Sequence, residues 1–63
     1  MSKTSVKVKL LGVDGSAYNI LGIVTKALER NGYKDLVKEY MEKAMSGDYD
    51  NLLRVTMDYV EVE

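Results

Sequence analysis

The sequence predicts a small α+β domain with the element order β-α-α-α-β. Apolar residues alternate with charged ones near both ends of the chain, and they recur every three or four positions through its middle. Turn and capping residues separate these segments. A chain of 63 residues has room for one domain, so residues 1–63 are expected to form a single unit. We expect a two-stranded, antiparallel ribbon of the chain ends, packed on one side by three short helices.

The first strand is expected over residues 5–11. Apolar and basic side chains alternate there, so one face of the strand would be buried and the other would be wet. The apolar positions are Val6, Val8 and Leu10, and the basic positions are Lys7 and Lys9.

A turn over residues 13–16 leads into the first helix, which is expected to run from residue 17 to about residue 31. An Asp-Gly pair favours the turn, and Ser16 is well placed to cap the helix. Gly32 is a typical residue just beyond a helix end. The apolar positions of this helix are Ala17, Ile20, Leu21, Ile23, Val24, Ala27 and Leu28.

Two further helices are expected, over residues 34–45 and from the cap at Asp48 to about residue 58. A Ser-Gly pair ends the first of them, and Asp50 lies in the first turn of the second, where the helix dipole favours an acid. The expected buried stripe of the earlier helix contains Leu36, Val37, Tyr40, Met41, Ala44 and Met45. That of the later helix contains Leu52, Leu53 and Thr56, with Met57 as a further candidate.

Residues 59–63 alternate again and are interpreted as the second strand. Val60 and Val62 would join the valines of the first strand on the buried face, and Glu61 and Glu63 would face its lysines. Opposite charges on neighbouring strands contribute about 0.2–1 kcal/mol per pair. The third helix runs almost directly into this strand, which favours antiparallel pairing.

The sequence has no His and no Cys, and this absence argues against most self-contained active sites. These residues supply the usual proton shuttles, most transition-metal ligands and the strongest nucleophile. Asp48, Asp50 and Asn51 begin like a calcium loop, but the required Gly at the sixth position and Glu at the twelfth are missing. We therefore expect no catalytic residue, no cofactor-binding residue, no metal ligand and no enzyme activity.

The charge balance argues against nucleic acid and membranes as partners. Nine basic and ten acidic residues give a formal net charge of −1. No apolar run matches a signal peptide or the roughly 20 residues that span a bilayer, so a cytoplasmic location is expected. The alternative function is a nucleic-acid-binding accessory protein that uses Lys3, Lys7 and Lys9.

A small non-enzymatic protein-interaction or regulatory module is the function that the sequence favours. On a helical wheel, Gly22 falls on the polar side of the first helix, between Tyr18 one turn earlier and Lys26 one turn later. Glycine inside a helix costs about 1 kcal/mol relative to alanine, so close approach of a partner is one explanation, and packing within the chain is the other. The five tyrosines are expected to border the core. A two-stranded ribbon also exposes its edges, which makes a homodimer a second form of partnership.

Two stretches, D-G-S-A-Y-N-I-L-G at 14–22 and S-G-D-Y-D at 46–50, resemble a family of small bacterial and phage proteins. One follows the family pattern D-G-[NS]-A-[FY]-x-[IL]-L-G, and the other contains a shared S-G-D-Y-D segment. The resemblance implies a compact natural domain and makes Gly22 part of the family pattern, but it implies no function, substrate or site. The matching residues are D-G-S-A-Y at 14–18, I-L-G at 20–22, K-A-L at 26–28, S-G-D-Y-D at 46–50, L-L at 52–53 and V-E-V at 60–62.

Overall fold

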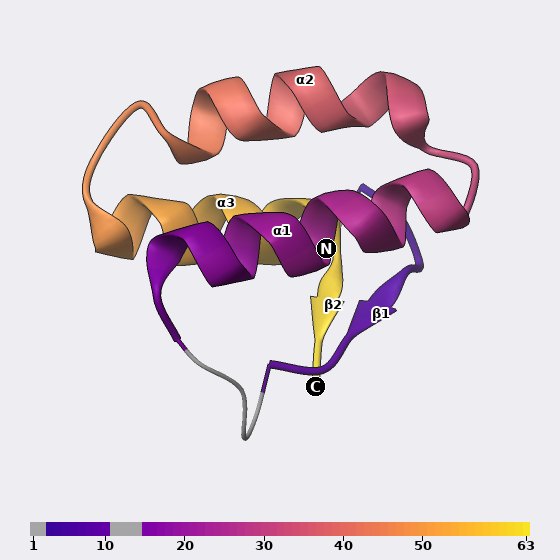
Figure 1. Ribbon diagram of the computed structural model, residues 1–63, viewed down its shortest axis with the longest axis horizontal. Helices are drawn as coiled ribbons and strands as arrows, with labels where there is room; N and C mark the ends of the chain where they lie inside the picture. Colours follow the sequence, from indigo (N-terminus) through magenta and orange to yellow (C-terminus); the bar gives the residue numbers. More distant parts are fainter. Residues whose placement is uncertain (1–2, 11–14) are drawn as a thin grey trace.

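Three helices make up most of the domain, and two very short strands pair beside them (Figure 1). The computed structural model describes residues 3–10 and 15–63. No helix within these ranges is long and apolar enough to cross a membrane. The elements are β1 (Lys7–Val8), α1 (Ala17–Arg30), α2 (Lys34–Ala44), α3 (Tyr49–Tyr59) and β2 (Glu61–Val62).

The predicted antiparallel ribbon is wrong, because β1 and β2 run parallel with Lys7 opposite Glu61. Each strand has only two residues, so the domain is mostly helical. The direction follows from the end of α3, whose last carbonyls need partners. The Lys3 amide donates to Asp58 O at 2.6 Å, and the Thr4 amide donates to Tyr59 O at 3.2 Å. Both strands therefore start at the same end of α3 and leave it in the same direction.

The helix boundaries follow the local signals of the sequence. The Ser16 hydroxyl accepts a hydrogen bond from the Asn19 amide, and the Asp48 carboxylate accepts one from the Asn51 amide, so both predicted caps are confirmed. Gly32 has a φ of +86°, a conformation that glycine adopts at little cost. The predicted turn before α1 falls partly outside the described residues, as does the end of the predicted first strand.

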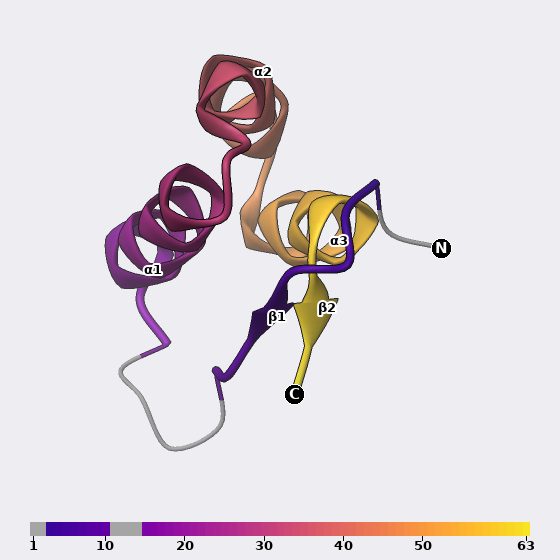
Figure 2. The same cartoon turned by 90° about the vertical axis from the view of Figure 1, so that its right-hand side faces the viewer.

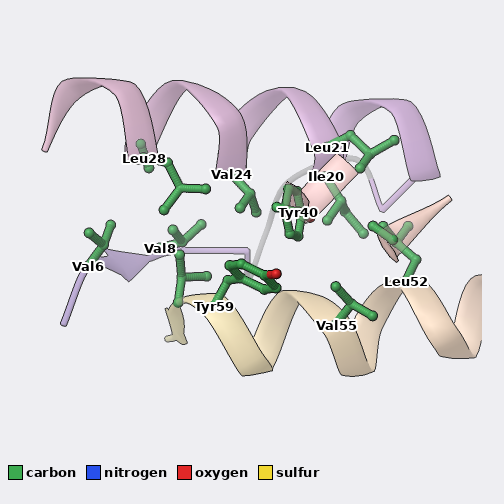
Figure 3. Close-up of a cluster of buried hydrophobic side chains, with 13 residues drawn as sticks. Val6, Val8, Ile20, Leu21, Val24, Leu28, Tyr40, Leu52, Val55 and Tyr59 are labelled. Atoms are coloured by element: carbon green, nitrogen blue, oxygen red, sulfur yellow. The ribbon is translucent and has the colours of Figure 1, made fainter. Parts of the chain in front are cut away.

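The core lies between the three helices and the inner face of the strands. Figure 2 looks along the helices and shows both strands on one side of them. The apolar face of α1 packs on α2, α3 and β1. Figure 3 shows its side chains pointing toward those of the other elements. The buried apolar residues are Val6, Val8, Ile20, Leu21, Val24, Ala27, Leu28, Tyr40, Ala44, Leu52, Val55, Tyr59 and Val60.

Several expected core positions differ from the structure. Val62 is 41% exposed because β2 contacts only β1 and α3 among the described elements. Met57 is also exposed, whereas Val55, two residues earlier on α3, is buried. Tyr40 and Tyr59 are core residues rather than border residues, and their rings meet edge to face at 5.5 Å.

Candidate protein-interaction site

A groove of about 240 Å³ opens at the end of the bundle where α1 begins and α2 ends. Its walls come from three places in the chain: the first turns of α1, the last turn of α2, and the connection into α3. Most of its lining is apolar, which is typical of sites that receive an apolar group. The lining residues are Ala17, Tyr18, Leu21, Ala44, Met45, Gly47, Asp48, Tyr49 and Leu52.

Three large side chains around the groove are exposed to solvent. Tyr18 is 84% exposed, Met45 58% and Tyr49 45%. The Tyr49 hydroxyl donates a hydrogen bond to Gly15 O, which joins the start of α3 to the segment before α1. Apolar side chains gathered around a hollow are typical of a surface that another molecule covers.

The shape of the groove is fixed by hydrogen bonds at the connection between α2 and α3. The Asn51 side-chain amide donates to Lys43 O at 3.0 Å and contacts Ala44 O at 3.5 Å. The Asn51 main-chain amide donates to Asp48 Oδ1 at 3.0 Å. These bonds hold the last turn of α2 against the first turn of α3, so the groove does not depend on a partner for its shape.

Asp48 gives the groove a negative charge at its rim. Among the described residues that line the groove it is the only charged one, and Asp50 lies two positions further along the chain, in α3. The first nine residues of α1, on the opposite wall, carry no charge. Over the described residues, the rim is therefore acidic on the α3 side and uncharged along the start of α1.

The structure separates the residues that the sequence grouped as a partner surface. Tyr18 lines the groove, but Gly22 and Lys26 do not. A methyl group placed on Gly22 would meet nothing within 4 Å, so packing within the described chain does not explain this glycine. Sequence reasoning missed Met45 as a surface residue because it continues the apolar stripe of α2. The signal that could have found it is its place at the helix end, beside the Ser-Gly pair.

A polar cluster surrounds Tyr59 where the N-terminal segment, α2 and α3 meet. Glu39 Oε2 accepts hydrogen bonds from the Tyr59 hydroxyl and from Lys3 Nζ, the latter at 2.9 Å, and Lys43 Nζ lies 4.0 Å away. The hydrogen bond from Tyr59 and that from Lys3 lower the pKa of Glu39. The same carboxylate raises the pKa of Lys3. The cluster ties the N-terminal segment to α2 and α3, which is a structural role.

This cluster also bears on the basic residues proposed for nucleic acid. Lys3 is ion-paired with Glu39 and lies 4.9 Å above the Tyr59 ring, whereas Lys7 and Lys9 are exposed at β1. The three lysines are therefore not one free patch. Among residues 3–10 and 15–63, no group of three or more acidic side chains is arranged to hold a metal ion.

Comparisons with protein-family models, with curated proteins and with solved structures gave no match. The resemblance to small bacterial and phage proteins stays a prediction.

Proposed function

We propose that this protein is a non-enzymatic, cytoplasmic protein-interaction module whose groove receives an apolar side chain of a partner protein. The observation that carries the proposal is the exposure of Tyr18, Met45 and Tyr49 around one hollow of fixed shape. Tyrosine and methionine are enriched in the buried centres of protein interfaces. A partner side chain in the groove would cover all three residues at once.

Because the rim carries the negative charge of Asp48, we expect the partner segment to have a basic residue beside the apolar side chain that enters the groove, which we call its anchor. A Lys or Arg next to the anchor would meet Asp48, while an acidic residue there would be repelled. Methionine adapts its shape to different anchors, so the groove supports recognition of a short motif rather than one unique surface.

A pair of synthetic peptides tests the proposal, one with a central Leu between arginines and one with the same Leu between aspartates. We expect the first peptide to shift the NMR signals of Tyr18, Leu21 and Met45 and the second to leave them unchanged. The variant Asp48→Asn keeps an oxygen for the helix cap but removes the charge, so it should reduce this discrimination.

Met45 and Met57 offer a matched pair of variants for the same measurement. Both side chains are 58% exposed, but Met57 does not line the groove. Met45→Gln should weaken binding of the arginine-flanked peptide, and Met57→Gln should leave its binding unchanged. Equal effects of the two variants, or no binding of either peptide, would contradict the proposal.

Self-association stays a separate prediction. A homodimer would raise the solution mass above that of one chain as concentration increases. Sedimentation over a concentration series tests this, and a constant mass of one chain would exclude it.

A further inference from the structure

Among the described residues, no strand pairs with the edge of β1 that faces away from β2, and this open edge suggests a second binding surface. Within the described ranges the sheet has two strands, so β1 is paired on one edge only. Glu61 and Glu63 donate to Val6 O and Val8 O, and Leu10 donates to Glu63 O. Successive residues of a strand direct their main-chain groups to opposite edges. The N–H and C=O groups of Lys7 and Lys9 therefore face away from β2.

A face of α1 lies next to this open edge. Figure 2 shows α1 and β2 on opposite sides of β1, and α1 packs directly on β1. Ile23, Lys26 and Arg30 follow the spacing i, i+3, i+7, which places them on one face of the helix. Tyr18 and Leu21 line the groove beside α2 and α3, so the Ile23 face lies on the other flank of α1. A strand added to β1 would run below that flank.

Exposed cations lie on both sides of this edge. Lys7 in β1 and Lys9 just beyond it are exposed on the outer face, where Glu61 of β2 lies opposite Lys7, and Lys26 and Arg30 are exposed on α1. Ile23 is half-buried and offers an apolar contact between these cations. Lysines along an edge discourage pairing with a second copy of the same edge, because like charges would oppose one another. The complementary occupant is a strand whose outward side chains are acidic.

We propose that the open edge of β1 binds an extended acidic segment of a partner protein as a third strand. Its main chain would hydrogen-bond with Lys7 and Lys9, and its acidic side chains would lie on the outer face, next to the side chains of these two lysines. Its alternate, apolar side chains would face Ile23. This is the strand-addition mode of peptide recognition, in which main-chain bonds give affinity and side chains give specificity. The surface is separate from the groove.

A synthetic peptide that alternates Val and Glu tests this proposal against the full chain. NMR hydrogen exchange should show slower exchange of the Lys7 and Lys9 amides when the peptide is bound. The same peptide with N-methyl groups on the amides of one edge should lose this protection. A peptide with its valines and glutamates in two separate blocks should also bind less tightly. Bound peptide without protection of the two amides would overturn the proposal.

Reversing the charges of Lys7 and Lys9 distinguishes a loss of peptide recognition from a loss of the fold. Lys7→Glu together with Lys9→Glu should weaken binding of the Val-Glu peptide by roughly two- to five-fold per lysine. The same variant should gain affinity for a Val-Lys peptide, which an unfolded chain would not do. Lys34→Glu with Lys38→Glu is the matched control, because both lysines are exposed on α2, away from β1.

A single-stranded DNA oligonucleotide provides the competing arm of the experiment. Phosphate contacts by the same cations would give steeply salt-dependent binding without amide protection. Tighter binding of DNA than of the Val-Glu peptide would overturn the proposal and assign the cations to nucleic acid. Variants of Tyr18 and Met45 should leave the Val-Glu peptide unaffected, so failure here is distinguishable from failure of the groove.

Discussion

The hydroxyl of Tyr40 lies 2.7 Å from Oγ1 of Thr56, and both side chains are buried. Either oxygen can donate, so the pair satisfies two buried polar groups with one hydrogen bond. The bond joins α2 to α3 in the middle of the core. It also explains why a threonine can occupy a fully buried position of an otherwise apolar helix face.

Removing one partner of this pair should cost more than removing both. Thr56→Val leaves the Tyr40 hydroxyl buried without a partner, for which we expect a loss of about 1–3 kcal/mol in the free energy of unfolding. Combining it with Tyr40→Phe should recover part of that loss, since no orphaned hydroxyl remains. Urea unfolding of the three variants measures this, with Thr25→Val as a half-buried control. If the double variant lost as much free energy of unfolding as the two single variants together, the result would contradict the pairing of these hydroxyls.

Alkaline pH should destabilise the protein through Tyr40. Burial raises the pKa of Tyr40, and the hydrogen bond with Thr56 offsets part of the rise. The stabilisation is complete below the unfolded value near 10 and is lost as the pH rises toward the folded value. Tyr40→Phe should therefore make stability fall less steeply above that pH. Unfolding followed by far-UV circular dichroism at increasing pH tests the expectation, and equal slopes would exclude it.

Acid should weaken the cluster around Glu39. The Tyr59 hydroxyl, followed by Lys3, lowers the pKa of Glu39 below its ordinary value of 4.5. Its contribution is present above that pH and is lost as the pH falls through the folded pKa. Glu39→Gln should flatten this part of the stability profile, whereas Glu42→Gln, at an exposed site of α2, should not. A profile unchanged by Glu39→Gln would show that the carboxylate does not hold the N-terminal segment.

Alanine substitutions at Gly22 and Gly32 should change the stability of the protein in opposite directions. Gly22 lies inside a helix with free space around its Cα, so Gly22→Ala should stabilise the protein by about 0.8–1.0 kcal/mol. Gly32 has a φ of +86°, so Gly32→Ala should destabilise it by about 1–2 kcal/mol. Thermal or urea unfolding measures both. Destabilisation by Gly22→Ala would reveal a contact that the described residues do not provide.

The cap of α3 can be tested independently of its charge. Asp48→Ala removes the oxygen that accepts from the Asn51 amide, and we expect it to cost about 1 kcal/mol. Asp48→Asn should cost much less, because an amide oxygen also accepts. Equal losses in urea unfolding would mean that the charge, rather than the cap, stabilises the helix start.

Local signals made the helices predictable, whereas contacts between distant segments did not. Ser16, Gly32 and Asp48 act within one turn of their own positions, so the sequence alone places the helix ends. The strand direction depends on Lys3 and Thr4 reaching the end of α3, a contact that no periodic pattern records.

The candidate groove was predictable only through Tyr18. The sequence put Tyr18 on the polar side of its helix, and the structure places it in the groove wall. Met45 and Tyr49 join it because the connection between α2 and α3 turns sharply, and the polar–apolar pattern carries no information on that turn. The sequence predicted that the edges of the two-stranded ribbon are exposed. It did not predict that Ile23, Lys26 and Arg30 lie near the edge of β1, because that depends on how α1 packs.

The parallel ladder also sets the order in which the domain can assemble. Thr4 and Tyr59, joined by a hydrogen bond, are 55 positions apart. Closing so long a loop costs chain entropy that only the finished bundle can offset, whereas α1–α2 and α2–α3 close over short connections. The helical hairpins are therefore expected to form early and the strand pair last. During synthesis β1 would therefore stay unpaired on both edges until β2 has left the ribosome.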